Sequence, residues 1–272
     1  MLLNSYSEAT IKTISILGTG WLGLPLAQHF VSMGHNVIGS TTSKHRLTEL
    51  TSIGVKPFLI DIGSLPDTIQ EFLQADVLII NIPSKDIAGF RLLAQAIEKS
   101  ALKNIVFVSS TSVYDNTNTV ITEADGLESE QSPLVIIENL LKKCNTAKTT
   151  IVRFGGLIGH SRNPGNFFRK GRKVQHPDSR VNLIHRDDCI AIITQIIEQE
   201  VWGEVFNCCA DTHPTKREFY TQAATSIGNP APEFILTGTS PYKIISNQKV
   251  KQRLHYQFLH PDLMKIQFED AL

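Results

Sequence analysis

The sequence of 272 residues lacks an excess of charge of either sign, because 26 lysines and arginines are matched by 26 aspartates and glutamates. Without a basic field, the composition gives no reason to expect binding to nucleic acid or to an anionic membrane surface. Apolar runs long enough to span a membrane are also absent. We therefore expect a small-molecule substrate, no nucleic-acid or membrane partner, and a monomer or homodimer.

Cysteine is scarce, and its spacing does not suit a disulfide framework or a metal site. The chain has four cysteines, Cys144, Cys189, Cys208 and Cys209, which form no C-x-x-C pair. This pattern predicts reduced, buried thiols in a cytoplasmic protein, and it gives no reason to expect a bound metal. The first ten residues lack the basic and apolar regions of a signal peptide, which also favours the cytoplasm.

A glycine-rich turn follows the first short apolar run, residues 13–17. Gly18, Gly20 and Gly23 have the spacing G-x-G-x-x-G, with a predicted strand before them and an apolar-periodic helix after them. The first glycine permits a tight turn, the second lets the backbone approach a pyrophosphate, and the third allows close helix–strand packing. The pattern predicts a dinucleotide site at the helix N-terminus, with a purely structural turn as the alternative. The predicted contacts are Gly18, Thr19, Gly20, Trp21, Leu22 and Gly23.

The second predicted strand, residues 35–40, lacks the carboxylate that in many NAD-binding folds accepts hydrogen bonds from the adenosine ribose. Hydroxyls and cations stand there instead, and they would suit a 2′-phosphate. The cofactor predicted is therefore NADP, with NAD as the alternative if the cations are simply solvated. The predicted contacts are Thr41, Thr42, Ser43, Lys44 and Arg46, and Asp61 after the third strand is expected near the adenine.

Strands and helices alternate regularly along the first half of the chain. Apolar strands are predicted at 56–60, 76–81 and 104–109, with helices at 65–73 and 87–101 between them. Asn81, Ile82 and Pro83 stand at the carboxyl end of the fourth strand, where ligands of open α/β sheets bind, so we predict cofactor contacts there. Short connections and near-continuous apolar strands predict a doubly wound parallel α/β sheet of the Rossmann type.

Four further segments carry a resemblance to a known family. They are Ser109-Ser-Thr-Ser-Val-Tyr114, Val152-Arg-Phe-Gly-Gly-Leu-Ile-Gly159, Asn182-Leu-Ile-His-Arg-Asp-Asp188 and Gly203-Glu-Val-Phe-Asn207. In this order and spacing they resemble the extended short-chain dehydrogenase/reductase superfamily, which includes nucleotide-sugar epimerases and dehydratases. The chain is most similar to the atypical, small epimerase-like members, because Leu17 stands where most extended members have an extra glycine.

The resemblance implies a division of labour along the chain. Residues 1–155 would bind NAD(P), with helix 187–200 packed on them, and residues 156–186 and 201–272 would form a small C-terminal substrate lobe. It also implies that Ser110 polarises a substrate oxygen, that Tyr114 is a second catalytic candidate, and that Ser109 lies at the cofactor. The alternative for the serines is a turn that satisfies its own backbone.

Substrate contacts are expected from Arg153, Arg162 and His185, although His185 has the alternative of capping the next helix. A buried Arg153 would need a carboxylate partner, for which Asp187 and Asp188 are the expected candidates. The basic and aromatic stretch 162–173 would hold a diphosphate and stack a base, or else form a solvated loop.

One feature of the family is missing. The family's acid/base is a tyrosine followed four residues later by a lysine, and none of the five tyrosines has a lysine at that spacing. When the sequence is aligned on Glu138, the tyrosine position falls near Glu130 and the lysine position falls on Leu134. Glu138 itself could be a substitute base or an outward-facing helix charge. Loss of general acid–base catalysis costs on the order of a hundred- to ten-thousandfold in rate.

Two hypotheses from different classes therefore remain. The chain is an NAD(P)-dependent epimerase-, dehydratase- or reductase-like protein acting on a sugar nucleotide or a related hydroxyl or carbonyl compound, or it is an NADP-binding sensor or scaffold without catalysis. The glycine loop and Ile82-Pro83 also resemble β-hydroxyacid and nucleotide-sugar 6-dehydrogenases. Those enzymes continue with a large all-helical domain, whereas this chain continues with further strands.

Overall fold

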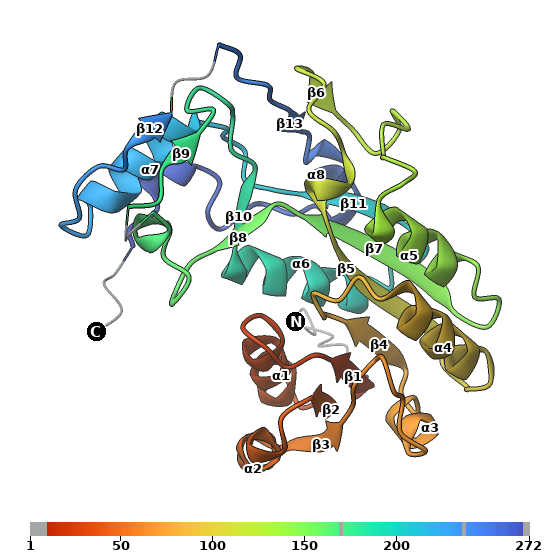
Figure 1. Ribbon diagram of the computed structural model, residues 1–272. Helices are drawn as coiled ribbons and strands as arrows, with labels where there is room; N and C mark the ends of the chain where they lie inside the picture. The colour runs from red at the N-terminus through yellow and green to blue at the C-terminus, as the bar shows by residue number, and fades with distance from the viewer. Residues whose placement is uncertain (1–9, 169–170, 236–237, 269–272) are drawn as a thin grey trace, which may run out of the picture. The chain divides into compact units, whose positions relative to one another are not determined.

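The computed structural model describes residues 10–168, 171–235 and 238–268 (Figure 1). The strands of the central sheet are β1 (Thr13–Leu17), β2 (Asn36–Thr41), β3 (Val55–Leu59), β4 (Val77–Ile80), β5 (Asn104–Ser110), β7 (Lys148–Phe154) and β11 (Val205–Cys208). The helices are α1 (Gly23–Ser32), α2 (Leu47–Ser52), α3 (Ile69–Phe72), α4 (Ile87–Glu98), α5 (Pro133–Lys142), α6 (Arg186–Glu198), α7 (Lys216–Thr225) and α8 (Gln248–Leu254). Single 3-10 turns are η1 (Lys44–Arg46), η2 (Thr111–Val113), η3 (Pro164–Asn166) and η4 (Leu263–Lys265).

The central sheet has seven strands in the order β11-β7-β5-β4-β1-β2-β3. The order reverses direction at β1, which is the switch point that defines a doubly wound fold. The predicted parallel α/β fold of the Rossmann type is therefore confirmed. The chain divides into two compact units, one of residues 1–105 and 144–148 and the other of residues 106–143 and 149–272. Their boundary falls inside β5, and the proposed division of the chain into cofactor and substrate lobes stays a prediction.

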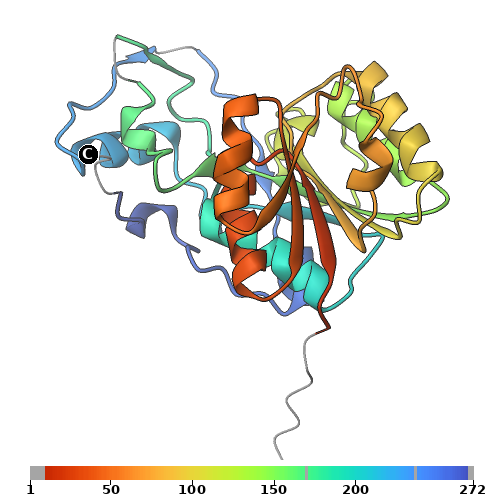
Figure 2. The same ribbon diagram turned by 90° about the horizontal axis from the view of Figure 1, so that it is seen from below.

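The first unit contains the parallel pairs β4–β1, β1–β2 and β2–β3. The strands are buried because helices cover both faces: α1 and α2 lie on one side of β1–β3, and α3 and α4 lie on the other (Figure 2). Leu26, Ala27 and Phe30 form the buried stripe of α1, at the spacing of one helical face. The glycine turn and the ends of β2 and β4 thus rest on a packed core.

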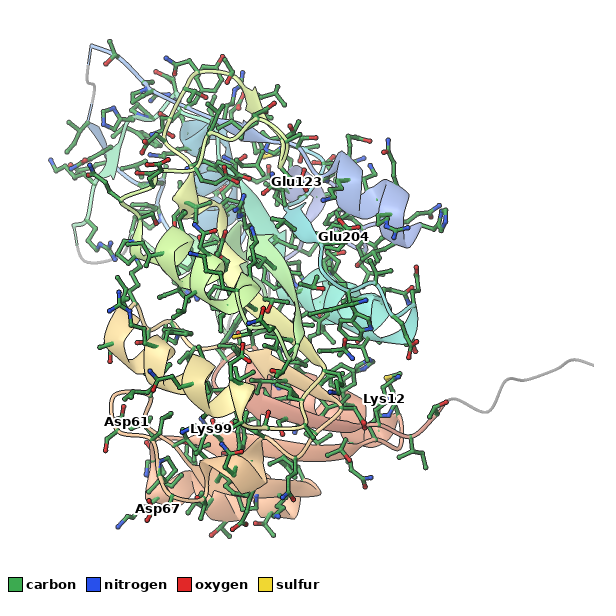
Figure 3. The ribbon with its side chains drawn as sticks, turned by 90° about the vertical axis from the view of Figure 1, so that its right-hand side faces the viewer. Lys12, Asp61, Asp67, Lys99, Glu123 and Glu204 are labelled. Carbon is green, nitrogen blue, oxygen red and sulfur yellow. The ribbon has the colours of Figure 1, made fainter. Side chains whose placement is uncertain are left out.

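The second unit contains β7, its parallel neighbour β11, and the helices α5, α6 and α8. Four isoleucines of α6 are buried, namely Ile192, Ile193, Ile196 and Ile197, and α8 packs against both α6 and β11. Glu204, at the start of β11, pairs with Lys249 at 3.0 Å and with Arg253 at 3.5 Å, which fastens α8 to the strand (Figure 3). These elements place the carboxyl ends of β7 and β11 beside the segment that follows β5.

Three short parallel pairs complete the second unit. β8 (Gly156–Ile158) pairs with β10 (Leu183–His185), β9 (Val174–Gln175) with β12 (Phe234–Ile235), and β6 (Val120–Ile121) with β13 (Ile244–Ile245). Figure 1 shows β9 and β12 next to α7, and η3, which belongs to the stretch 162–173, packs against α7. Arg169 and Lys170 of that stretch, and the N-terminal residues in which no signal peptide was expected, lie outside the described residues. Among the described helices, none is both long and apolar enough to cross a membrane.

Candidate functional site

The three glycines of the turn after β1 meet different surroundings. Gly18 has φ +98°, and a Cβ on it would lie 2.5 Å from the Asn81 carbonyl oxygen. A Cβ on Gly23 would lie 2.0 Å from the Gly18 carbonyl oxygen, so that position has to be glycine for α1 to start against β1. A Cβ on Gly20 would meet no atom within 4 Å. Gly18 and Gly23 are therefore required by the protein's own backbone, whereas Gly20 faces open space.

Hydrogen bonds hold this turn to the ends of the neighbouring strands. The backbone N–H and the hydroxyl of Thr19 both donate to the Ser40 carbonyl oxygen, at 2.9 and 2.8 Å. The Ser40 hydroxyl accepts from the Gly18 N–H at 3.0 Å, and the Asn81 amide donates to the Gly18 carbonyl at 3.2 Å. Thr19 and Ser40 are buried. The carboxyl ends of β1, β2 and β4 are thus fixed as one rigid edge.

A pocket of about 460 Å³ opens at this edge of the first unit. Ten of the predicted cofactor contacts line it, namely Gly18, Thr19, Gly20, Thr41, Thr42, Arg46, Asp61, Asn81, Ile82 and Pro83. The lining also includes residues that the sequence did not single out, namely Leu17, Ser40, Ile60, Ile62 and Ser84. The additional residues lie at strand ends, where alternation in the sequence does not reveal which side chains face a ligand.

The charges at this pocket come from Arg46 and Asp61. Arg46 is half-buried, and its Nε lies 2.9 Å from a carboxylate oxygen of Glu49, one turn further along. Asp61 is exposed at the end of β3 (Figure 3), and it accepts a hydrogen bond from the Gly63 N–H at 2.9 Å. No carboxylate follows β2 before Glu49, as the sequence indicated. The pocket therefore offers hydroxyls and one guanidinium at the end of β2.

Some predicted cofactor residues lie outside the pocket lining. Trp21, Leu22 and Gly23 form the start of α1, and Ser43 and Lys44 stand at the start of η1. Their contacts with a cofactor stay predictions. A helix start leaves backbone N–H groups without intrahelical partners, and α1 has no acidic residue in its first turn, so this end is suited to an anion.

The second unit holds a buried ion-pair network around Arg153. The guanidinium Nε lies 3.0 Å from one carboxylate oxygen of Glu138, and Nη2 lies 2.5 Å from the other. Nη1 also pairs with Glu128. The expected pairing of Arg153 with Asp187 or Asp188 is therefore wrong, and so is the picture of Glu138 as an outward charge, because Glu138 is only 1% exposed. Strand β7 and helix α5 lie close enough for a direct, two-bond contact.

This network also occupies two of the predicted cofactor and catalytic residues. The Ser109 hydroxyl donates to Glu138 at 2.6 Å, and both groups are buried. The Tyr114 hydroxyl lies 3.0 Å from Asn207 Oδ1 and accepts from Arg153 Nη1 at 2.5 Å. Although burial would lower it, the bonds and charge of Glu138 hold the pKa of Arg153 above its ordinary value. Burial raises the pKa of Tyr114, despite the opposing charge of Arg153. Tyr114 is thus built into the protein's interior.

Ser110 differs from its neighbours in the same segment. Its hydroxyl accepts a hydrogen bond from the Ser112 N–H at 3.1 Å and caps η2, and its side chain is half-buried. That bond leaves the hydroxyl proton available for donation to a ligand. Of the hydroxyl groups predicted here, Ser110 therefore keeps the freedom that substrate polarisation requires, and its catalytic role stays a prediction.

His185 caps α6, as one of the sequence alternatives held. Its Nδ1 accepts from the Asp187 N–H at 3.3 Å. Burial, and next the charge of His260, lower the pKa of His185 to about 4. Asp188 is fully buried and accepts hydrogen bonds from the Tyr256 hydroxyl at 2.7 Å and the Leu259 N–H at 2.6 Å. Asp188 therefore connects the C-terminal segment to the start of α6, and it does not pair with Arg153.

Two histidines that the sequence did not single out lie beside His185. His160 Nε2 is 2.7 Å from Asp187 Oδ1, and His260 Nε2 is 3.7 Å from Asp187 Oδ2. No short motif links these positions, which are far apart in the chain, so sequence spacing gave no signal. Arg162, a predicted substrate residue, is exposed and closes the turn with Gly159 through two backbone hydrogen bonds.

A glycine turn at the start of a doubly wound sheet, with an open pocket at its carboxyl edge, defines a dinucleotide-binding protein. Residues 18–200 match the family model described as NAD(P)H-binding, and the chain belongs to this family. The predicted NAD(P)-binding family is thereby confirmed, and the fold is similar to that of solved short-chain dehydrogenase/reductase and epimerase structures.

The relatives agree with this assignment. Protein YeeZ of Escherichia coli (strain K12) is 29% identical over 275 residues, which cover 95% of this chain and 100% of that protein. A UDP-glucuronic acid 4-epimerase from Bacillus cereus, solved with UDP-glucuronic acid and NAD, superimposes with a TM-score of 0.76 at 18% identity, covering 93% of this chain and 95% of that chain. A short-chain dehydrogenase/reductase superfamily protein from Agrobacterium tumefaciens with bound NAD gives 0.74 at 17% identity, covering 90% and 92%.

Proposed function

We propose that the chain binds NADP(H) in the pocket at the glycine turn and acts as a reductase- or epimerase-like enzyme on a hydroxyl or carbonyl compound, a sugar nucleotide or a relative of one. The observation that carries the first part is the contrast among the glycines. Gly18 and Gly23 have backbone reasons to lack a side chain, but Gly20 has only open pocket in front of it. A missing Cβ at that place suits the close approach of a pyrophosphate.

The preference for NADP rests on the end of β2. Thr42 and Arg46 line the pocket there, and the carboxylate that would bind a ribose diol is lacking. A guanidinium binds a phosphate through two parallel hydrogen bonds, and a 2′-phosphate can draw Arg46 away from its half-exposed partner Glu49 because an exposed pair of this kind contributes little.

A second pocket supports a nucleotide-bearing substrate. It has a volume of about 260 Å³ and lies in the second unit, lined by Phe168, Arg172 and Tyr220 among others. The rings of Phe168 and Tyr220 meet edge to face at 4.7 Å, and the Arg172 guanidinium lies 6.0 Å from the Phe168 ring. Aromatic faces beside a cation are what a base and a diphosphate require. The Bacillus cereus epimerase binds such a compound, UDP-glucuronic acid.

Cofactor binding is tested by titrating NADPH and NADH into the parent chain, Gly20→Ala and Arg46→Ala. We expect Gly20→Ala to fold with unchanged stability and to bind both cofactors at least tenfold more weakly, since one displaced charge-assisted hydrogen bond costs about 1.5–3 kcal/mol. Arg46→Ala should weaken NADPH but leave NADH nearly unchanged. Lys99→Ala is the control, because Lys99 is an exposed cation of the same unit that lies outside the pocket lining. Parent-like binding by Gly20→Ala would refute the site.

A second function, NADP binding without catalysis, is favoured by one observation. At the position where the family has its lysine, Leu134 packs against the apolar cluster around Val113 and Ile245. Turnover of sugar nucleotides with NADPH decides between the two. Activity that is lost in Ser110→Ala and kept in the neighbouring Ser112→Ala would establish the enzyme, whereas tight NADPH binding with no turnover of any nucleotide sugar would favour the sensor.

A further inference from the structure

We propose that His160, His185 and Asp187, with His260 beside them, form a binding site for a divalent transition-metal ion of the zinc or cobalt type. Each of the first three residues offers a ligand atom, and these atoms all lie within 4.8 Å of one another. His260 adds a third imidazole, whose ring centre is 3.8 Å from that of His185. All four residues belong to the second unit, and none of them lines the dinucleotide pocket of the first.

The fold brings these residues together through one short strand pair. β8 and β10 run in parallel, with Ile158 opposite His185. Figure 1 shows the two strands next to each other. The residues that follow the two strands, His160 and Asp187, therefore emerge side by side. The C-terminal segment joins them because the His260 N–H donates to Asp188 at 3.1 Å. Two strand ends and one anchored segment thus converge on a single point.

The backbone is strained at the residue that completes the cluster. His160 has φ +48°, in the left-handed region that non-glycine residues seldom adopt. Gly159 before it has φ +106°, and a Cβ there would lie 2.2 Å from His185 Nε2. The turn thus accepts a left-handed histidine where glycine or asparagine would be easier. His176 and His255 share this left-handed conformation, so it helps to position His160 but does not by itself indicate a function.

The donor set and its spacing suit a small, borderline ion. Imidazole nitrogens and a carboxylate are ligands of zinc, nickel, copper and cobalt, with bonds of about 2.0–2.2 Å, which places ligand atoms roughly 3.3–3.5 Å apart in a tetrahedron. One carboxylate oxygen of Asp187 lies 2.7 Å from His160 Nε2, and the other lies 3.4 Å from His185 Nδ1 and 3.7 Å from His260 Nε2. A metal bound by His185 Nδ1 would replace the long 3.3 Å hydrogen bond that this nitrogen accepts from the Asp187 N–H. The side chains of His160 and Asp187 are 44% and 39% exposed, so an ion can enter and the ligands can adjust.

The competing explanation is a cluster of hydrogen-bonded histidines around one carboxylate, with no affinity for a metal. The test uses the full-length chain without a polyhistidine tag. Co²⁺ is titrated and its visible absorption is recorded, and Zn²⁺ binding is measured by calorimetry. We expect one equivalent to bind, a tetrahedral cobalt spectrum, and displacement of Co²⁺ by Zn²⁺. Sulfur-to-cobalt absorption is not expected, because the four cysteines are buried elsewhere.

Variants then locate the site. His160→Gly and Asp187→Asn should each weaken Co²⁺ binding at least tenfold, since even partners outside the ligand shell cost that much. His255→Asn is the matched control, because His255 is also an exposed histidine with a left-handed φ, +50°. His160→Gly should melt no lower than the parent in the absence of metal, which separates loss of a ligand from loss of the fold. Absence of saturable binding, parent-like affinity in both ligand variants, or equal loss in His255→Asn would overturn the proposal.

Discussion

The buried pair between Arg153 and Glu138 yields a stability prediction that can be worked out from its contacts. Replacing Arg153 by leucine leaves Glu138 buried without its two guanidinium bonds and removes the partner of Glu128. Breaking a buried pair from one side costs about 3–5 kcal/mol, because the remaining charge stays desolvated. Arg153→Leu should therefore lose about 4 kcal/mol of unfolding free energy, a large part of the stability of an ordinary domain.

Glu138→Leu should lower the free energy of unfolding by roughly 3 kcal/mol, at the lower end of the range for breaking a buried ion pair. Two opposing effects lead to this value. Arg153 keeps Glu128, whose side chain is 19% exposed, so some of its charge remains paired. The Ser109 hydroxyl loses its buried acceptor, which adds about 1 kcal/mol. The double variant replaces both charges by apolar groups and should cost much less than the two single changes together. We expect a coupling energy of about 2–3 kcal/mol between them.

The assay is urea unfolding at neutral pH, followed by circular dichroism and by tryptophan fluorescence. Trp21 belongs to the first unit and Trp202 to the second, so a Trp21→Phe background makes the fluorescence report on the unit that holds the pair. The control cycle uses Glu204 and Lys249 in the same unit, which are 3.0 Å apart but 29% and 38% exposed. That pair should couple by less than about 1 kcal/mol. A coupling energy for Arg153 and Glu138 as small as the control's would refute the reasoning.

Three further predictions follow from single sites. Gly23→Ala should lower the melting temperature, unlike Gly20→Ala, because its Cβ would lie 2.0 Å from the Gly18 carbonyl oxygen; equal melting would contradict this. The thiols should not react with Ellman's reagent until the chain is denatured, since all four are buried and burial raises the pKa of Cys144 to about 11. Burial lowers the pKa of His213 from 6.5, so its contribution to the free energy of unfolding is full above pH 6.5 and falls as the pH drops below that value. The variant His213→Gln should therefore flatten the loss of stability at acid pH. The control His45→Gln, at an exposed position, should leave that loss unchanged.

The elements near the glycine turn were predictable because their signals are local. A run such as Val77–Ile80 is apolar throughout, and a strand buried on both faces needs that composition. The glycine spacing also predicted a tight turn at Gly18 and close helix–strand packing at Gly23, and the surroundings of both residues agree with this. Each of these inferences depends on residues within a few positions of one another. These predictions do not depend on how segments that are distant in the sequence pack together.

The partners of Arg153 were not predictable, because they depend on the register between elements. The sequence indicated that a buried arginine needs a carboxylate, which is correct. The sequence could not show which acidic residue is the partner, because Glu128, Glu138 and the pair Asp187 and Asp188 come from different segments. The expected partners, Asp187 and Asp188, make other contacts. Asp188 accepts backbone bonds from residues 259 and 260, and Asp187 lies among histidines. The choice falls to α5, whose helical face directs Glu138 toward β7.

The missing tyrosine–lysine pair has a structural counterpart in the second unit. Leu134, at the lysine position, contributes to the apolar cluster that also contains Val113 and Tyr114. A lysine there would bury its stem in that cluster, so the position favours packing over charge. A different lysine, Lys243, donates to the Tyr114 carbonyl from the C-terminal segment, and burial lowers its pKa. Leu134 therefore cannot supply the proton that the family's lysine helps to move, which is why turnover, rather than cofactor binding, is the measurement that separates an enzyme from a sensor.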